Sequence, residues 1–468
     1  MTRRRILAFV LGLVALVLTI RIAWRVAPAG PNVMLVVIDT LRADHLGAYG
    51  YDRPTSPNLD ALARRGTRFA RAYATSSWTG ASVASMLTGL SPGVHGMDGH
   101  TSDLGDRWPR LPEAFRDAGY ETGAISANPA FVSPEVGFGS GFDSFDVLHG
   151  APAKPTDAGD HIWAHPNMTT LVHVAGANVV TDAAIAWVRR HRTEAFFLYL
   201  HYFDPHASYL PPPAYARKFG VDPSSPLAGM QQRMVMFPGL PPADPADLAT
   251  LIGLYDGEIA FTDAEIGRLI AEIEPLVTRP TILLVTSDHG EEFGDHGGLQ
   301  HGKTLFEEQI RVPLLITRLG DEGSTADVIA TPFSLVDLWS LLAGMTGVST
   351  RPGAAPLALA DLTAAPAALP VFADLATNGR VHRWANVAEP HKLIVARDQS
   401  SLLYDLRRDP AEKVNLARED PTRARVLREA LTRQQASWAA ERRGVTPGPA
   451  PSWSQERLDR LRALGYAE

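Results

Sequence analysis

Apolar runs that alternate with helix-like segments are the feature that most constrains the fold of this sequence. The runs begin at Asn32, surround Ile125, and occupy residues 196–200 and 281–286, with helical patterns between them. A continuous apolar run is typical of a parallel strand that is covered on both faces. The alternation therefore predicts an α/β fold, with a large, mostly parallel sheet flanked by helices.

Polar residues follow each of these runs. The carboxyl ends of parallel strands meet at one edge of an open sheet, and ligands bind in the crevice outside that edge. A single aspartate after a strand is a common turn residue, but four polar clusters at the same edge indicate a site. The residues concerned are Asp39, Asn128, His201, His206, Asp288 and His289.

Three of these residues offer ligands for a divalent cation. Asp39 and Asp288 supply carboxylate oxygens and His289 supplies an imidazole nitrogen, which suits Ca²⁺, Mg²⁺, Mn²⁺ or Zn²⁺. Thr79 stands where the segment 76–89 turns into a helix. Its hydroxyl either caps that helix or acts as a nucleophile beside a cation. The residues alone leave both interpretations open.

Composition excludes several classes of function. The chain has 468 residues, 45% of them hydrophobic, and a formal net charge of −7. Because no lysine or arginine run suggests a binding arm either, we expect no nucleic-acid partner. The absence of cysteine excludes disulfides, thiolate metal sites and a cysteine nucleophile.

The N-terminal segment predicts export. Residues 1–30 begin with three arginines, continue as a long apolar stretch and end in a Pro/Ala/Gly break. This pattern is typical of a signal peptide or a single N-terminal membrane anchor, in which residues 6–26 would enter the membrane if they are not cleaved. A buried N-terminal helix is the alternative. We expect an exported protein, periplasmic or otherwise extracytoplasmic, or anchored to the inner membrane.

Seven blocks of the sequence carry a resemblance to one family. They cover nearly everything after the N-terminal segment, at residues 32–74, 84–96, 196–212, 254–267, 286–297, 301–316 and 402–417. In this order the blocks resemble the sulfatase family of the alkaline phosphatase superfamily. The resemblance implies that family's α/β fold, with a smaller C-terminal α+β subdomain.

The same resemblance implies a nucleophile and a metal site. Thr79 falls on the position of the family's nucleophile. Asp39, Asp288 and His289, together with Thr79, match the ligands of one divalent metal ion. These roles are expectations that follow from position within the blocks.

Further residues match those that hold the substrate. Lys303 and His206 match residues that grip the transferred oxyanion and assist catalysis. His201, His301 and Asn128 are expected to contact the substrate. The substrate implied is an anionic ester, which is a small molecule, a glycan or a lipid head group.

The chain departs from the family at the nucleophile. Sulfatases usually carry Cys-x-Pro-x-Arg, whose cysteine is oxidised to formylglycine, whereas residues 79–83 here read TGASV. That maturation cannot happen in this chain. A threonine instead resembles the nucleophile of phosphatase-like relatives, where an alkoxide attacks directly.

Other departures concern the metal and its neighbours. Ala127 and Asn128 stand in place of the usual Gly-Lys, and Thr40 stands where many relatives have a second aspartate. His289 stands where calcium-type members often have asparagine, which favours Mn²⁺ or Zn²⁺.

These residues predict a metal-dependent hydrolase of sulfuric, phosphoric or phosphonic esters, with the Thr79 alkoxide as nucleophile. Two alternatives remain. One is a membrane-anchored transferase that moves phospho-groups onto lipids or glycans. The other is a non-catalytic binding protein that keeps the sulfatase fold.

The sequence also predicts where the chain divides. After residues 1–30, a catalytic domain is expected over 31–350. A subdomain with a small antiparallel sheet follows at 351–440, and an amphipathic tail helix at 441–468.

Overall fold

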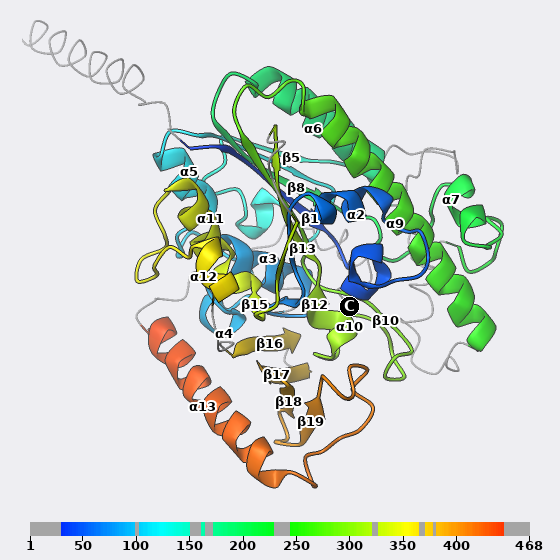
Figure 1. Ribbon diagram of the computed structural model, residues 1–468, viewed down its shortest axis with the longest axis vertical. Helices are drawn as coiled ribbons and strands as arrows, with labels where there is room; N and C mark the ends of the chain where they lie inside the picture. The colour runs from blue at the N-terminus through cyan, green and yellow to red at the C-terminus, as the bar shows by residue number, and fades with distance from the viewer. Residues whose placement is uncertain are drawn as a thin grey trace, which may run out of the picture.

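The computed structural model describes residues 30–98, 103–149, 161–163, 172–228, 244–320, 326–364, 370–377 and 381–443. Within these residues, the largest element is an eight-stranded sheet (Figure 1). From β9 to β5 all neighbouring strands are parallel, whereas β13 runs antiparallel to both β9 and β2. The spatial order is β14 (Asp327–Ile329), β2 (Thr67–Phe69), β13 (Leu314–Leu319), β9 (Thr281–Ser287), β1 (Asn32–Ile38), β8 (Phe196–Tyr202), β4 (Glu121–Ser126) and β5 (Ser144–Val147).

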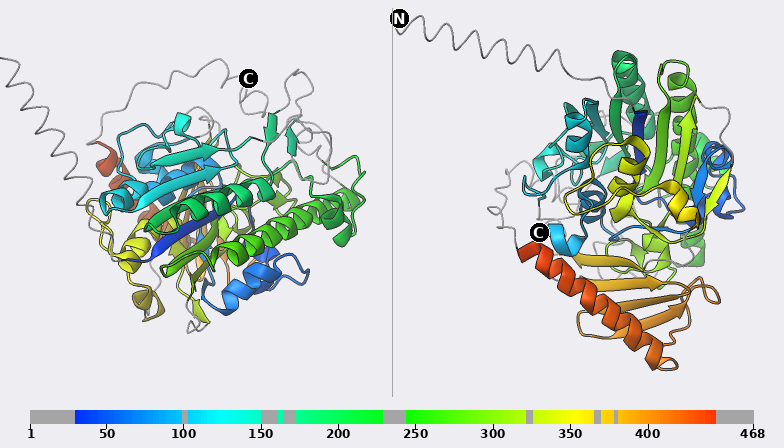
Figure 2. Two further views of the ribbon diagram at one scale, coloured as in Figure 1. Left: turned by 90° about the horizontal axis from the view of Figure 1, so that it is seen from above. Right: turned by 60° about the vertical axis from the view of Figure 1, so that its left-hand side comes forward.

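Helices cover both faces of this sheet. One face carries α6 (Ala177–His191) and α9 (Pro245–Ile273), which pack against each other. The opposite face carries α3 (Thr79–Thr88), α5 (Leu111–Asp117) and α11 (Leu338–Thr346) (Figure 2). The sheet is therefore the middle of three layers, as expected when parallel strands must be covered on both faces.

Shorter elements connect these layers. The helices among them are α2 (Pro57–Arg64), which packs against α9, α4 (Pro92–His95), α7 (Pro213–Lys218), α10 (Glu307–Ile310) and α12 (Leu359–Ala364). The strands are β3 (Ala72–Tyr73), β6 (His161–Trp163), β7 (Val172–Val174), β10 (Glu292–Phe293), β11 (Leu299–Gln300), β12 (Arg311–Val312) and β15 (Phe333–Ser334).

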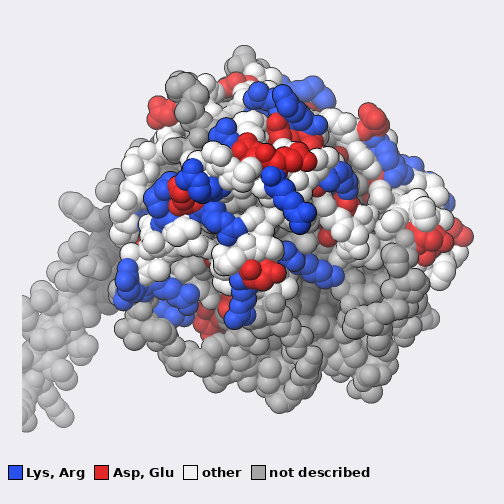
Figure 3. Space-filling view, turned by 90° about the horizontal axis from the view of Figure 1, so that it is seen from below, with Lys and Arg blue, Asp and Glu red and all other residues white. Residues whose placement is uncertain are grey.

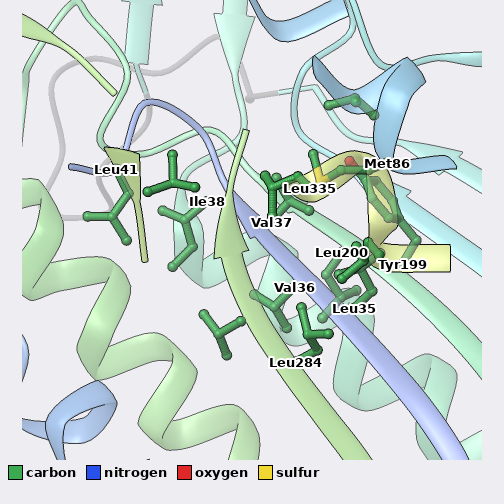
Figure 4. Close-up of a cluster of buried hydrophobic side chains, with 14 of the residues drawn as sticks. Leu35, Val36, Val37, Ile38, Leu41, Met86, Tyr199, Leu200, Leu284 and Leu335 are labelled. Carbon is green, nitrogen blue, oxygen red and sulfur yellow. The ribbon is translucent and has the colours of Figure 1, made fainter. Parts of the chain in front are cut away.

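The core surrounds β1, and every residue of this strand is buried. Successive side chains of a strand point to opposite faces of its sheet, so β1 contributes apolar groups to both layers of packing. Figure 4 shows Leu35 to Ile38 among side chains from α3, β8 and β9, including Met86, Leu200 and Leu284. This two-sided burial explains why the first apolar run is continuous rather than alternating.

A second, smaller sheet follows the three-layered part. Its strands are antiparallel and lie in the order β16 (Val371–Thr377), β17 (Val381–Ala388), β18 (His391–Ala396) and β19 (Ser401–Asp405). Helix α13 (Pro421–Arg443) packs against β17, β18 and α4.

On the described part of the face seen from below, basic and acidic side chains lie interspersed (Figure 3).

A buried ion pair network fastens the small sheet to the rest of the chain. Lys392 of β18 is fully buried, and its Nζ lies 3.0 Å from both Glu307 Oε1 and Glu412 Oε1. Nearby, the backbone N–H of Asp374 in β16 donates to the carbonyl of Thr75 at 2.8 Å. The two sheets therefore share a polar junction as well as apolar packing.

The predicted fold class is confirmed. The strands expected at Asn32, around Ile125, and at 196–200 and 281–286 are β1, β4, β8 and β9. The predicted signal or anchor at 1–30 lies almost wholly outside the described residues, as does most of the tail at 441–468. None of the helices in the described residues combines the length and apolar character needed to span a membrane.

We predict that Lys392→Ala destabilises the protein by about 3–5 kcal/mol, because it leaves two acidic side chains buried together without their cation. Burial already raises the pKa of Glu412 to about 7, and the charge of Lys392 opposes that rise. Urea unfolding followed by tryptophan fluorescence measures the loss. The control is Arg408→Ala, which removes an exposed pairing with Asp405 and should cost less than about 1 kcal/mol. Equal stability of the Lys392→Ala variant and the wild type would contradict this view of the junction.

Candidate active site

The register of three neighbouring strands builds the candidate site. Ile38 of β1 pairs with Tyr202 of β8 on one side and with Ser287 of β9 on the other. The next residues, Asp39 and Asp288, therefore leave the sheet at the same level, on adjacent strands. The N–H of Thr40 donates to Asp288 Oδ1 at 3.1 Å, which ties the two chain segments together.

One oxygen of Asp39 is held by two neighbours. Asn128 Nδ2 donates to Asp39 Oδ2 at 2.9 Å, and His201 Nε2 lies 3.1 Å from the same oxygen. A carboxylate only accepts hydrogen bonds, so His201 carries its proton on Nε2, and Nδ1 accepts from the Tyr199 hydroxyl at 2.9 Å. Asn128 Oδ1 in turn accepts from the N–H of Phe131 at 3.0 Å. Asn128 and His201, which we expected to contact substrate, thus use their polar atoms to support Asp39.

The hydroxyl of Thr79 faces the same cluster. Thr79 is the first residue of α3, the N-cap is Trp78, and no side chain caps this helix. The alternative that Thr79 is only a helix cap is therefore wrong. Its Oγ1 lies 3.1 Å from His289 Nε2. Because the carbonyl of Gly290, 2.9 Å from His289 Nδ1, can only accept, Nδ1 carries a proton, and a ring with that single proton accepts from Thr79 at Nε2.

The carboxylates of Asp39 and Asp288 each keep one oxygen without a hydrogen bond. Both side chains are fully buried, and among the described residues Asp39 Oδ1 and Asp288 Oδ2 have no hydrogen-bond partner. His289 Nε2 lies 3.4 Å from Asp288 Oδ2. Asp39, His201 and Asp288 also offer ligand atoms that all lie within 4.8 Å of one another. Buried oxygens without partners are rare in proteins, so this buried Asp–His–Asp group fits a divalent cation.

The pKa shifts of Asp39 and Asp288 are consistent with a cation at this place. Burial alone would raise the pKa of Asp39, but the charge of His206 and the hydrogen bond and charge of His201 outweigh it and hold that pKa below its usual range. Burial, and then the negative charge of Asp39, raise the pKa of Asp288. Ionising two adjacent buried carboxylates costs free energy, because their negative charges repel each other. A cation between them would offset that repulsion.

Two further histidines lie against this cluster. The His301 ring centroid is 4.4 Å from that of His289 and 4.9 Å from that of His206. His206 Nδ1 lies 2.5 Å from the carbonyl of Ala207, which fixes the proton on Nδ1. Burial lowers the pKa of His206 to about 4, although the charge of Asp39 opposes this. Burial, with the nearby His289, also lowers the pKa of His301 well below its usual value.

Lys303 differs from the other predicted site residues. It is exposed, and its Nζ donates to the carbonyl of Leu299 at 3.0 Å. No hydrogen bond in the described residues joins it to the Asp39 cluster. Partial burial lowers the pKa of Lys303, and the negative charges of Glu291 and Glu292 oppose this.

Sequence reasoning missed two residues of the cluster. Glu291 is fully buried and its Oε1 lies 2.9 Å from His301 Nδ1. Tyr209 donates its hydroxyl to Glu291 Oε2 at 2.9 Å. Both stand inside blocks that carry the family resemblance, but in the sequence nothing separates Glu291 from the neighbouring acids Glu292 and Asp295.

Fold and site are those of an α/β enzyme whose chemistry takes place at the carboxyl edge of its sheet. The model of the sulfatase family matches residues 31–348. The chain therefore belongs to the sulfatase family, and it is a sulfatase-like ester hydrolase.

Curated relatives and solved structures agree with this assignment. The chain is 25% identical to an arylsulfatase of Clostridium perfringens, covering 86% of this chain and 94% of the relative. It is also 25% identical to human iduronate 2-sulfatase, covering 69% of this chain and 70% of the relative. Its fold resembles that of a phosphonate monoester hydrolase of Agrobacterium radiobacter, with a TM-score of 0.67, 20% identity, and coverage of 87% of this chain and 96% of that one.

We predict that a divalent cation stabilises the wild type but not a variant that combines Asp39→Asn with Asp288→Asn. At a cation concentration 100 times its Kd, binding should add about 2.7 kcal/mol to the free energy of unfolding. Thermal unfolding with Mn²⁺, Zn²⁺, Ca²⁺ and Mg²⁺ in turn measures the shift and ranks the metals.

The matched control is Asp263→Asn, which alters another buried carboxyl group, whose pKa burial raises to about 6. This control should keep the full cation-dependent shift. Equal stabilisation of the doubly substituted variant and the wild type would show that the cation binds elsewhere.

Proposed function

We propose that this protein is a metal-dependent hydrolase of phosphate or phosphonate esters, with Thr79 as its nucleophile. The observation that carries the proposal is the position of Thr79 Oγ1, 3.1 Å from His289 Nε2, which in turn lies 3.4 Å from Asp288 Oδ2. The hydroxyl is buried, and it stands at the N-terminus of a ten-residue helix. Free N–H groups and the helix dipole favour negative charge at that position.

Asp39 and Asp288 would hold the cation, with His289 as a nitrogen ligand. Once bound, it supplies positive charge that favours the deprotonated form of the Thr79 oxygen. Two carboxylates and imidazole make a borderline donor set, which favours Mn²⁺ or Zn²⁺ over Ca²⁺. Asn128 and His201 keep the Asp39 carboxylate in a fixed orientation through the bonds to its Oδ2.

The remaining polar groups would act on the transferred group. With its proton on Nδ1, the neutral His206 ring can accept a proton at Nε2, and His301 lies between His206 and His289. Lys303 would reach the oxyanion by exchanging its bond to the Leu299 carbonyl for one to the substrate. A positive donor at that place stabilises the charge that develops in the transition state by about 3–4 kcal/mol.

Hydrolysis then takes two steps. The Thr79 oxygen attacks the central atom and the alcohol leaves, which forms an ester on Thr79. Water attacks the same central atom in the second step and releases the acid, restoring the hydroxyl. A formylglycine hydrate carries a second hydroxyl whose proton loss breaks the carbon–oxygen bond, but a threonine ester has none. Water must therefore attack phosphorus or sulfur directly, and this requirement favours phosphate and phosphonate esters.

The family also contains enzymes of sulfated glycans, so the proposal covers more than one kind of leaving alcohol. One structure of similar fold, with a TM-score of 0.69 and 19% identity over 88% of this chain and 98% of that one, holds D-glucosamine-2-N,6-O-disulfate as its substrate. We propose an anionic ester of a glycan, a lipid head group or a small alcohol, met outside the cytoplasm after export through residues 1–30.

We predict that Thr79→Ala lowers kcat for 4-nitrophenyl phosphate and phosphonate by at least about 10³-fold, because the variant lacks the attacking oxygen. Thr79→Ser should keep part of the activity. In the wild type, the phospho-esters should turn over faster than 4-nitrophenyl sulfate.

The control is Thr88→Ala, which alters another threonine of α3 whose hydroxyl bonds the carbonyl of Ala84 at 2.7 Å. It should leave kcat within about twofold. Equal turnover by Thr79→Ala and the wild type would identify water as the direct nucleophile. Turnover of the sulfate ester alone would overturn the proposed substrate class.

A further inference from the structure

Glu291 is a buried acid beside the candidate active site. The proposed mechanism assigns it no role. It stands three residues after Asp288 and is fully buried. Its two carboxyl oxygens bond two different residues, with Oε1 at 2.9 Å from His301 Nδ1 and Oε2 at 2.9 Å from the Tyr209 hydroxyl. Burying a carboxyl group is costly unless its hydrogen bonds are made, so these two bonds are what allow Glu291 to lie there.

The bond to Glu291 decides which nitrogen of His301 can accept a proton during the reaction. Because a carboxylate oxygen accepts, Nδ1 of His301 carries a proton that points towards Glu291. Burial lowers the pKa of His301, so Nε2 carries no proton and is the nitrogen that can accept one. The ring itself lies against His289 and His206, at centroid distances of 4.4 and 4.9 Å.

Contacts of the neighbouring backbone hold Glu291 in this place. A Cβ added to Gly290 would lie 2.1 Å from the carbonyl oxygen of Glu308, so only glycine lets the chain pass so close to α10. The N–H of Gly290 also donates to the carbonyl of Gln309 at 2.9 Å. Glu291 is therefore fixed from the backbone side by this passage and from the side-chain side by Tyr209.

We propose that Glu291 is a positioning residue that holds the His301 ring so that its unprotonated Nε2 accepts a proton from the water that attacks the Thr79 ester, and that Tyr209 holds Glu291 in turn. The inference rests on the proposed function, since it assigns His301 this role in the second step of hydrolysis. Residues that orient a functional imidazole through its second nitrogen typically change activity by about 10- to 100-fold when they are removed.

The test compares kcat and KM for 4-nitrophenyl phosphate in Glu291→Leu and Glu291→Gln. The leucine variant removes the acceptor, and kcat should fall by about 10- to 100-fold with little change in KM. The glutamine variant keeps an acceptor oxygen for His301, and its amide can donate to the Tyr209 oxygen. It should therefore retain kcat within about threefold of the wild type, which a role for the carboxylate charge would not allow.

A double-substitution cycle separates positioning from structural support. If Glu291 acts through His301, Glu291→Leu should have almost no further effect on kcat in a His301→Ala background. A matched control is Glu308→Leu, because Glu308 also bonds a histidine, His296, at 2.9 Å, outside the cluster. It should leave kcat within about threefold. Tyr209→Phe supplies a second variant, which keeps the acid and should lower kcat in the same direction by a smaller factor.

The outcomes are distinct. Full activity of Glu291→Leu, an equal loss in the glutamine and leucine variants, or an undiminished effect of Glu291→Leu in the His301→Ala background would each overturn the inference while the proposed function stands. Absence of ester hydrolysis by the wild type overturns the proposed function, and this inference with it. A loss confined to Glu291→Leu and Tyr209→Phe, rescued by glutamine and absent without His301, supports it.

Discussion

The closeness of two buried carboxylates is the constraint on which the rest of the site depends. Asp39 and Asp288 end up side by side because β1 and β9 are adjacent, parallel and in register up to Ile38 and Ser287. Both are fully buried, so their charges repel in a medium that screens poorly. A structure can keep such a pair only by surrounding it with donors and positive charge.

The neighbouring elements supply these groups from several directions. His201 from β8 and Asn128 after β4 bond one oxygen of Asp39, and the N–H of Thr40 bonds one oxygen of Asp288. One oxygen of each carboxylate remains without a hydrogen bond, and the Asp39, His201 and Asp288 group could hold a divalent cation. In this account Thr79 matters because α3 brings its hydroxyl to the same place, where its proton is most easily removed.

The sequence was enough to predict the strands of the large sheet and the polar residues that directly follow them. Continuous apolar runs such as 32–38 indicate strands covered on both faces, and the carboxyl edge then follows from parallel pairing. The sequence could not separate contact with substrate from support of a neighbour. Asn128 follows β4 like any site residue, yet both polar atoms of its amide are used within the protein.

Loops set a second limit on prediction from the sequence. The chain between Asp288 and Lys303 doubles back through β10 and β11, and this path brings Glu291 to His301 and leaves Lys303 exposed. Neither consequence can be derived from residue spacing, because it depends on the close passage at Gly290 and on Tyr209 from a distant segment. Whether Thr79 caps α3 was likewise open until the structure placed Trp78, and not Thr79, at the N-cap of that helix.

The central claim is that Thr79 becomes covalently bonded to the transferred group. Its most direct test is to quench wild-type enzyme with acid during turnover of 4-nitrophenyl phosphate and to map phosphate on its peptides by mass spectrometry. The account predicts a phosphate ester on Thr79 that appears within the first turnover and disappears when substrate is exhausted. Phosphate on a different residue, or none at any time through a single turnover, would contradict it.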